Sequence, residues 1–385
     1  MSSQRRILII GGGIVGFGLA ANLLKLGERE VTLLEREKLP GQHSTGKSAG
    51  GFRAQFSTAI NVELMMRSIE ILTRFADEYG ADARVQQYGY LFMATSAEHL
   101  RVLRRNVELQ RSFGLQVEYI EGTGRISEIC PQINTEDLLG GTFCATDGYF
   151  DPYEFMQGYA NYAEERGLKT VYEAEVIGFE VKDDTVRVVR AKAGDFPVDV
   201  VVLAAGAWSG EVGKLAGLDI PVVPVRRQVF DTEPFGGISL QVPLMADMGN
   251  NFYLKSESGG FLLGCANKDE PPGFNTGVDL EYKFKVVEMA VHRFPVLADA
   301  TIREGWAGLY EVSPDHHAII GLVPPLTNFF VISGFSGHGA MQSPATTLCL
   351  AELIAEGRSR TVDISPLSVA RFRPGPSPLM ETAVI

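Results

Sequence analysis

The chain has 385 residues, of which 45% are apolar and 42 are glycine. This length and apolar content are sufficient for two or three domains with sizeable cores, which excludes a disordered chain or a coiled coil. The 35 Lys and Arg residues against 47 Asp and Glu residues give a formal charge of −12, which disfavours nucleic acid and anionic lipid as partners.

Cysteine usage indicates a reducing compartment. The four cysteines are far apart in the sequence and form no C-x-x-C pair: Cys130, Cys144, Cys265 and Cys349. They are too few for a disulfide framework in a chain of this length. We therefore expect reduced, mostly buried thiols in a cytoplasmic protein.

The first element follows Arg5 and Arg6, where residues 7–24 carry no charge. Such a stretch is typical of a signal peptide or a membrane span. Five of these eighteen residues are glycines at fixed positions. A buried strand at 7–10, a turn at 11–13 and a helix at 14–26 explain them better, so we expect no membrane span.

The next elements alternate between strand and helix. A second buried strand at 31–34 ends in Glu35 and completes a β-α-β unit. In chain order we then expect a loop rich in glycine and serine at 41–51, a helix at 58–79, a strand at 88–94, an arginine-rich helix around 101–111, and a helix at 153–166 that Asp151 caps and Pro152 begins.

The second half of the chain is richer in strands. Alternating runs at 176–181, 185–191 and 198–203 predict a β-meander, although 200–206 is apolar throughout, as in a central parallel strand. Several strands within 222–266 predict a mixed or antiparallel sheet with a helix at 280–294 laid upon it. A strand at 329–333, a glycine-rich turn at 334–339 and a helix at about 343–356 follow. The tail after Phe372 has three prolines in eight residues, which predicts disorder.

The clearest motif is Gly11-x-Gly13-x-x-Gly16, placed between a strand and a helix. This arrangement allows a tight turn and lets a pyrophosphate approach backbone N–H groups at the helix N-terminus. Glu35 ends the second strand, where a carboxylate accepts hydrogen bonds from both hydroxyls of a ribose. The motif predicts a dinucleotide site but does not decide between NAD and FAD.

The whole chain resembles the FAD-dependent D-amino-acid oxidase superfamily, within it the branch of sarcosine oxidase, glycine oxidase and the β subunit of dye-linked L-proline dehydrogenase. The resemblance is carried by Ile9-Ile10-Gly11-Gly12-Gly13-Ile14-Val15-Gly16, Ser44-Thr45-Gly46, Thr146-Asp147-Gly148 with Asp151-Pro152, Ala204-Ala205-Gly206-Ala207-Trp208, and Gly334-Phe335-Ser336-Gly337-His338-Gly339. It implies a mixed α/β fold: a Rossmann-like FAD-binding domain (1–84, 146–221, 316–385) and a discontinuous, sheet-based substrate domain (85–145, 222–315).

The motif and the resemblance together imply a set of residues that contact FAD. These are Gly11, Gly13, Ile14, Val15, Gly16, Glu35, Arg36, Ser44, Thr45, Ser48, Gly50, Gly51, Val176, Ala205, Gly206, Trp208, Gly334, Gly337, His338, Gly339 and Met341. The backbone N–H groups of the 334–339 motif are implied to face the pyrimidine end of the flavin, where negative charge accumulates on reduction.

The resemblance also implies the catalytic residues. Arg53 matches the arginine that grips the substrate carboxylate in sarcosine oxidases, a role that suits a guanidinium fork. Tyr253 and Tyr310 match aromatic positions of the substrate pocket, although each could equally be a core tyrosine. For His338 we favour a hydrogen bond to the flavin over general-base catalysis. His316 and His317 are adjacent, so their side chains diverge and we expect no metal site.

Three departures from the family pattern qualify the resemblance. The cysteine and the histidine that tether flavin covalently in sarcosine oxidases are absent, the cysteine position being Gly308, so we expect non-covalent FAD. Met341 occupies the position at which the family has a lysine that assists the carboxylate-binding arginine. The family lysine that activates oxygen aligns with Leu262, so we expect an electron acceptor other than oxygen. Lys255 and Lys268 lie nearby in the sequence and could supply the missing charge, so oxygen stays open as an acceptor.

The resulting hypothesis is a flavoenzyme that oxidises a small amino acid with a secondary amine, such as sarcosine. Hydride leaves Cα for flavin N5, and the imine hydrolyses. The alternatives are an L-proline dehydrogenase in a complex with partner subunits, a glycine or D-amino-acid oxidase, and an FAD-containing assembly factor without turnover. Arg53 distinguishes the enzyme from the assembly factor, because an assembly factor has no need of a carboxylate-binding arginine.

Overall fold

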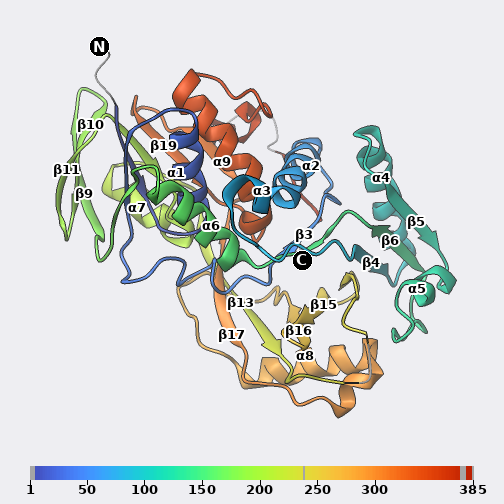
Figure 1. Cartoon of the computed structure of the whole chain (residues 1–385). Helices are drawn as coiled ribbons and strands as arrows, with labels where there is room; N and C mark the ends of the chain where they lie inside the picture. The colour runs from blue at the N-terminus through green and yellow to red at the C-terminus, as the bar shows by residue number, and fades with distance from the viewer. Residues whose placement is uncertain (1–4, 237–238, 373–378, 384–385) are drawn as a thin grey trace.

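The computed structural model of the chain describes residues 5–236, 239–372 and 379–383. Two large sheets form the frame, one of six strands and one of eight. Figure 1 shows the six-stranded sheet with its helices in the upper part of the molecule, and the eight-stranded sheet extending below and to the right. The prediction of a mixed α/β fold is confirmed.

The six-stranded sheet has the order β18-β19-β12-β1-β2-β8. Its strands are β1 (Arg6–Ile10), β2 (Glu30–Leu34), β8 (Lys169–Val171), β12 (Val200–Leu203), β18 (Ile319–Leu322) and β19 (Phe329–Ser333). Neighbouring strands are parallel except β18, which runs antiparallel to β19. β12 is therefore the central parallel strand that its apolar sequence predicts.

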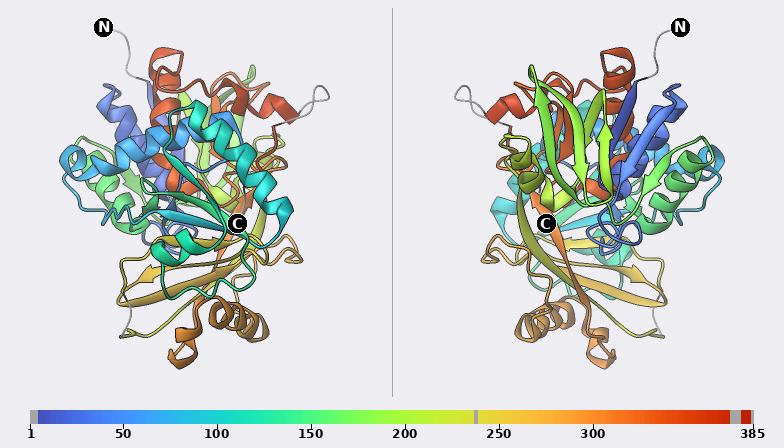
Figure 2. Two further views of the ribbon diagram at one scale, coloured as in Figure 1. Left: turned by 90° about the vertical axis from the view of Figure 1, so that its right-hand side faces the viewer. Right: turned by 90° about the vertical axis from the view of Figure 1, so that its left-hand side faces the viewer.

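Successive residues of β1 point to opposite faces of the six-stranded sheet. Ile7 and Ile9 enter the core under the helices α1 (Ile14–Lys25), α6 (Pro152–Glu164) and α9 (Gly339–Glu356). Leu8 and Ile10 enter a second core under the three-stranded sheet of β9 (Val176–Lys182), β10 (Thr185–Ala191) and β11 (Gly194–Pro197), which the right-hand view of Figure 2 shows in light green. The sheet is thus covered on both faces.

The prediction for the β-meander is wrong in its third strand. β11 pairs with β10 over 194–197, and the 198–203 run instead supplies β12 of the parallel sheet. The residues of β12 are all buried, whereas three of the four in β11 are exposed. A uniformly apolar strand belongs in a covered sheet rather than at the edge of a meander.

The eight-stranded sheet has the order β17-β13-β16-β15-β14-β4-β6-β5. The strands are β4 (Tyr90–Ala94), β5 (Val117–Glu121), β6 (Gly140–Cys144), β13 (Val223–Asp231), β14 (Leu244–Asp247), β15 (Phe252–Glu257), β16 (Gly260–Cys265) and β17 (Trp306–Val312). Helix α8 (Leu280–Arg293) packs on one face, as predicted. All these strands come from the two segments that we assign to the substrate domain, whose boundaries stay a prediction.

The other elements are short, apart from two helices. They are α2 (Ala59–Thr73), α3 (Phe75–Tyr79), α4 (Ala97–Ser112), α5 (Gly124–Ile129), α7 (Ser209–Leu215), the two-stranded pair β3 (Gly51–Phe52) and β7 (Gly148–Tyr149), and the 3₁₀ helices at Gly206–Trp208, Pro295–Asp299, Ser365–Leu367 and Val369–Phe372. The single helix predicted at 58–79 is wrong, because Arg74, with φ −106° and ψ 5°, interrupts it. Asp151 caps α6 as predicted, accepting from the N–H groups of Tyr153 and Glu154.

Helix α9 begins at Gly339, four residues earlier than predicted. A helix that began at about 343 would have Pro344 in its first turn, where a missing N–H group has no cost. In the structure Pro344 lies inside the helix, and the hydroxyl of Ser343 donates to the carbonyl of Ala340 at 2.9 Å. This bond satisfies the carbonyl that Pro344 leaves without an amide donor.

The predicted disorder of the tail is wrong for residues 379–383. Residues 373–378 lie outside the described residues, but Glu381 is only 1% exposed, and its N–H group donates to the carbonyl of Asp315 at 3.1 Å. Proline content predicts the lack of helix and strand but says nothing about tertiary anchoring by a single side chain.

Two further predictions concern the surroundings of the chain. All four cysteines are free and buried, as expected. Over the described residues, the structure contains no helix both long enough and apolar enough to cross a membrane.

Candidate active site

A cavity of about 510 Å³ lies between the two large sheets. The carboxyl ends of β1, β2 and β12 form one wall through Ile10, Leu34 and Ala204. The loop at 41–53 and the eight-stranded sheet form the others. Ligands of open α/β sheets bind at this edge of the strands, so the cavity is the candidate active site.

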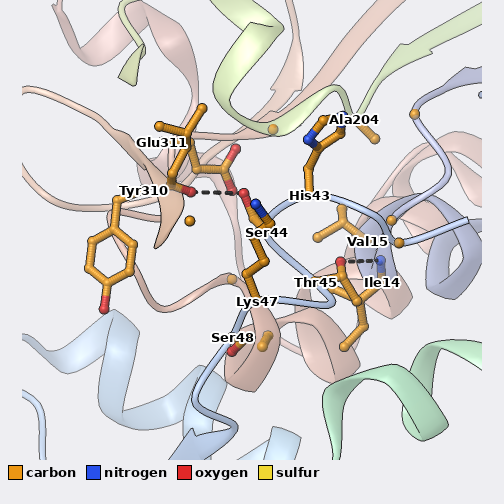
Figure 3. A pocket seen from close by; sticks show the side chains of 18 of the residues that line it. Ile14, Val15, His43, Ser44, Thr45, Lys47, Ser48, Ala204, Tyr310 and Glu311 are labelled. Atoms are coloured by element: carbon orange, nitrogen blue, oxygen red, sulfur yellow. Dashed lines mark hydrogen bonds between the residues drawn. The ribbon is translucent and has the colours of Figure 1, made fainter. Parts of the chain in front are cut away.

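One half of the cavity is made largely of backbone. Helix α1 begins after Gly13, and no side chain of the capping residue satisfies its first N–H groups. The hydroxyl of Thr45 accepts from the N–H group of Ile14 at 3.0 Å and thereby holds the 41–53 loop against the helix. Figure 3 shows this contact, with the loop between Ile14 on one side and Tyr310 and Glu311 on the other.

Glu35 is fixed at the end of β2. Its carboxylate accepts from the N–H group of Gly12 at 2.7 Å and from that of Glu37 at 2.8 Å. Each carboxylate oxygen keeps a lone pair for a further donor, as ribose binding requires. Near this end of the cavity the guanidinium of Arg36 lies 3.8 Å from the ring centroid of Trp208.

The structure brings most of the predicted cofactor residues together around this cavity. Its lining includes Gly11, Gly13, Ile14, Val15, Glu35, Arg36, Ser44, Thr45, Ser48, Gly50, Gly51, Val176, Ala205, Gly206, Trp208, Gly337, His338, Gly339 and Met341. Gly16 and Gly334 do not line it. A Cβ at Gly16 would stand 1.9 Å from the carbonyl oxygen of Gly11, so this glycine lets α1 pack against the turn.

The other half of the cavity is made of side chains on one face of the eight-stranded sheet. Tyr310 pairs with Val225 and Gly308 with Arg227 across β17 and β13, and Tyr253 pairs with Gly264 across β15 and β16. Alternation along each strand places Arg227, Tyr253 and Tyr310 on the same face, and all three line the cavity together with Tyr90.

Close backbone approaches hold the two predicted tyrosines. A Cβ at Gly264 would stand 2.1 Å from the Tyr253 ring, and a Cβ at Gly337 would stand 2.3 Å from the Tyr310 ring. The guanidinium of Arg227 lies 5.1 Å from the Tyr310 ring centroid. Burial raises the pKa of both phenols, so the tyrosines are neutral walls of the cavity.

Arg53 lies in the wall between the two halves and is 2% exposed. Its Nη1 donates to the carbonyl of Gln55 at 2.6 Å, and its Nη2 donates to the carbonyl of Ala383. The ring centroids of Phe56 and Phe92 lie 4.0 Å and 5.4 Å from the guanidinium. No carboxylate of the described chain forms an ion pair with Arg53.

Asp147 supports the segment that carries Arg53. Its carboxylate is fully buried and accepts from the N–H group of Ala54 at 2.9 Å and from the side-chain amide of Gln55 at 3.0 Å. Burial raises the pKa of Asp147 to about 6, against the lowering effect of these hydrogen bonds. The Thr146-Asp147-Gly148 motif therefore acts from outside the cavity, through the backbone next to Arg53.

Comparison with known proteins identifies the family. The profile described as FAD dependent oxidoreductase matches residues 6–353 of this chain. The chain belongs to this family of flavoproteins. Its predicted resemblance and its Rossmann-like FAD-binding fold are thereby confirmed, and FAD is its cofactor.

Three relatives show the range of this flavoprotein's family. FAD-dependent oxidoreductase domain-containing protein 1 of Bos taurus is 30% identical over 412 residues, which cover 95% of this chain and 84% of the relative. Mitochondrial dimethylglycine dehydrogenase of Rattus norvegicus is 30% identical over 370 residues, covering 91% of this chain but 43% of that enzyme. The crystal structure of L-proline dehydrogenase from P. horikoshii has a TM-score of 0.90 at 31% identity, covering 97% of this chain and 98% of that one.

The cavity of the flavoprotein fits FAD. The positive end of the α1 dipole suits a pyrophosphate, although the N–H group of Ile14 already donates to Thr45, and Glu35 suits a ribose. A Cβ at Gly206 would have no neighbour nearer than the Glu311 carboxylate at 3.7 Å, so the backbone there borders open space. The N-terminus of α9, at Gly339, borders the cavity without a side-chain cap and presents the positive end of the helix dipole.

His338 precedes this helix and is buried against Phe56, with the ring centroids 4.9 Å apart. Burial, and then the charge of Arg53, lower its pKa to about 3. A neutral imidazole of such low basicity is a poor general base at neutral pH. This supports the interpretation that His338 forms a hydrogen bond at the flavin rather than removing a proton.

Sequence reasoning missed several lining residues, among them Lys47, Arg227 and Glu311. Burial raises the pKa of Glu311 to about 7, although Ser333 donates to it at 2.7 Å. Alternation along 223–231 could show only which residues share a face with Arg227 within that strand, and the register between β13 and β17 is needed to place it beside Tyr310. No local pattern marks Lys47.

The two lysines considered near Leu262 do not line the cavity. Lys255 is 4% exposed and pairs with Glu257 at 2.6 Å. His316 and His317 form no metal site with their neighbours, and within the described ranges no group of three or more potential metal ligands occurs.

Proposed function

We propose that this flavoprotein oxidises a small amino acid with a secondary amine, such as sarcosine or another N-substituted glycine. The observation that carries the proposal is Arg53, a buried guanidinium in the wall of the FAD cavity that forms no ion pair with a carboxylate of the described chain. A buried charge of this kind needs a partner, and a substrate carboxylate supplies one with matching bidentate geometry.

FAD, when bound, supplies an acceptor for the hydride that leaves Cα, while the amine loses a proton and the resulting imine is hydrolysed by water. The residues of the chain bind and orient the substrate. Arg53 holds the carboxylate, and Tyr253 and Tyr310 exclude water around the amine. Arg227 and Arg53 both act electrostatically on the Tyr310 phenol, and two such charges also favour the neutral, reactive form of the substrate amine.

The relatives support this substrate class. Two of them are named for dehydrogenation of an N-methylated amino acid and of L-proline, both of which carry a substituted amine. The L-proline dehydrogenase structure favours L-proline as the second candidate, since it matches nearly the full length of both chains. Both proteins are named dehydrogenases, which favours an electron acceptor other than oxygen. The partner subunits and the cytoplasmic location of this protein stay predictions.

An anaerobic screen of amino acids tests the proposal. Sarcosine, N,N-dimethylglycine, L-proline, glycine and D-alanine are mixed with the oxidised protein, and bleaching of the flavin band near roughly 450 nm is recorded. We expect the secondary amines, sarcosine and L-proline, to bleach it fastest. Failure of every amino acid to reduce the flavin would contradict the enzyme and favour an FAD-containing assembly factor.

Acid precipitation tests the non-covalent attachment of FAD. No cysteine occupies position 308, which is glycine, so we expect a yellow supernatant and a colourless pellet. Flavin fluorescence that stays with the protein band in a denaturing gel would contradict this prediction.

A further inference from the structure

The segment 379–383 is anchored to the body of the protein by one buried side chain. Glu381 is 1% exposed, whereas its neighbours Leu379 and Met380 are 38% and 50% exposed. No helix or strand includes this segment. Its position therefore depends on side-chain contacts rather than on a backbone ladder.

Both oxygens of the Glu381 carboxylate are saturated with donors. One accepts from the N–H group and the hydroxyl of Ser57 and from the N–H group of Ala383; the other accepts from the hydroxyl of Thr58 and the side-chain amide of Asn61, both at 2.9 Å. Thr58 is the residue before α2, and Asn61 lies in its first turn. A carboxylate is stabilised at a helix N-terminus, so this anchor is specific for an acidic side chain.

The anchor brings the carbonyl of Ala383 to Arg53, the residue to which we assign the substrate carboxylate. Nη2 of Arg53 donates to this carbonyl, and Nη1 donates to that of Gln55. A guanidinium has five N–H groups, so three remain for a substrate. The ring of Phe56, whose centroid lies 4.0 Å from the guanidinium, packs against it, while the two carbonyls fix its orientation.

The 379–383 segment contacts Arg53 on the side that faces away from the large cavity. Thr382 and Ala383 line a separate small cavity of about 100 Å³, bounded by residues of α4 and β14, and none of residues 379–383 lines the large cavity. The contact therefore leaves the substrate side of Arg53 free.

We propose that Glu381 is a positioning residue: it seats the 379–383 segment so that the carbonyl of Ala383 aims the Arg53 guanidinium at the substrate carboxylate. The inference rests on the proposed function of Arg53. An arginine side chain has several rotatable bonds, and ordering them in advance lowers the entropic cost of binding. Misorientation of such a clamp weakens binding of the charged group and leaves uncharged contacts intact.

The test uses the FAD-loaded protein and two ligands without an oxidisable amine. One is (methylthio)acetate, CH₃-S-CH₂-COO⁻, called methylthioacetate below, and the other is its uncharged amide, methylthioacetamide. Each is titrated while the change in flavin absorbance is followed. The variants are Glu381→Gln, which replaces one acceptor oxygen with a donor group, and Glu381→Ala. Met380→Ala is the matched control, because Met380 is the exposed neighbour. FAD content and thermal unfolding are measured for each protein.

We expect Glu381→Gln to raise the Kd of methylthioacetate about tenfold and to leave that of methylthioacetamide unchanged. Met380→Ala should change neither. If the FAD-loaded variant binds both ligands as the parent does and only its unfolding temperature falls, Glu381 is merely structural and the inference is overturned. An equal weakening of acid and amide overturns it as well.

The parent protein separates this inference from the proposed function. If the parent binds methylthioacetate no more tightly than methylthioacetamide, and Arg53→Ala changes neither, the assignment of Arg53 fails and both proposals are overturned. If Arg53→Ala weakens the acid alone while Glu381→Gln does not, the proposed function stands and only the role of Glu381 is overturned.

Discussion

The two halves of the active-site cavity are built by different means. The half next to α1 consists mainly of turn backbone, a helix N-terminus and one carboxylate within residues 11–51, and residues from 174–176 and 204–208 complete it. The half under the eight-stranded sheet consists of side chains from distant segments, with Tyr90, Arg227, Tyr253 and Tyr310 brought together by strand register. A backbone site is sensitive to any added side chain, whereas a side-chain site is sensitive to the loss of particular charges and rings.

This difference predicts different mutational behaviour in the two halves. Added bulk should abolish cofactor binding in the first half, and removal of a charge should alter substrate binding or pH dependence in the second.

Gly16→Ala should have the largest effect. The new Cβ would stand 1.9 Å from the carbonyl oxygen of Gly11, and relief of such a backbone contact costs about 3 kcal/mol or more. We expect FAD binding to weaken at least about a hundredfold, measured as flavin content after purification and as Kd for FAD. Gly178→Ala, where a Cβ meets no atom within 4 Å, is the control. Full flavin content in Gly16→Ala would contradict the backbone interpretation.

Asp147→Asn tests the support between the halves through pH. Burial raises the pKa of Asp147 from 3.8 to about 6 in the folded protein, so the folded state holds this proton more tightly than the unfolded state. The free energy of unfolding should therefore fall as pH rises from about 4 to 6, by no more than about 3 kcal/mol, and this loss should be complete above pH 6.

Asparagine does not titrate, so that part of the pH dependence should vanish in Asp147→Asn. Urea unfolding of the FAD-loaded proteins at several pH values between about 4 and 7 measures the difference. The lost hydrogen bond to Gln55 lowers stability at every pH, so only the slope is diagnostic. Identical slopes in the two proteins would show that Asp147 is not the group that titrates.

Arg53→Ala should weaken substrate capture much more than FAD binding. Loss of a charge-assisted contact of roughly 1.5 to 3 kcal/mol lowers kcat/KM by about one to two orders of magnitude. Arg53→Lys should recover only part of it, because an ammonium lacks the planar fork. A variant that keeps its kcat/KM but loses FAD would place Arg53 in the wrong half of the cavity.

Arg227→Gln should have the smallest effect, a shift in the pH profile of turnover. Removal of one positive charge favours protonation of the substrate amine, so the apparent pKa that limits kcat at low pH should rise by about one unit or less. Arg226→Gln is the control, since the Arg226 guanidinium pairs with Glu270 at 2.8 Å. If the pH profile of turnover shifts in Arg226→Gln and not in Arg227→Gln, Arg227 does not act electrostatically on the substrate amine.

Much of the first half was determined by the sequence alone. The glycine spacing at 11–16 and the acid at 35 predict a dinucleotide site because contacts made by backbone leave a local pattern of small residues. The apolar run at 200–203 likewise predicts a covered strand, because such a strand is buried on both faces, and Asp151 with Pro152 predicts a helix start through capping. The resemblance added FAD and further residues that line the cavity, among them Ser44, Gly51 and Trp208.

The tertiary structure decided the rest. Arg227 reaches the cavity because Gly308 pairs with it across β13 and β17, and such pairing depends on residues some eighty positions apart in the chain. Helix α9 continues through Pro344, and the hydroxyl of Ser343 donates to the carbonyl of Ala340 there, a structural detail that the sequence pattern does not show. Glu381 lies beyond a proline-rich stretch that predicts disorder, yet it is buried by donors at 57–61, because the free energy that orders this segment comes from contacts that are remote in sequence.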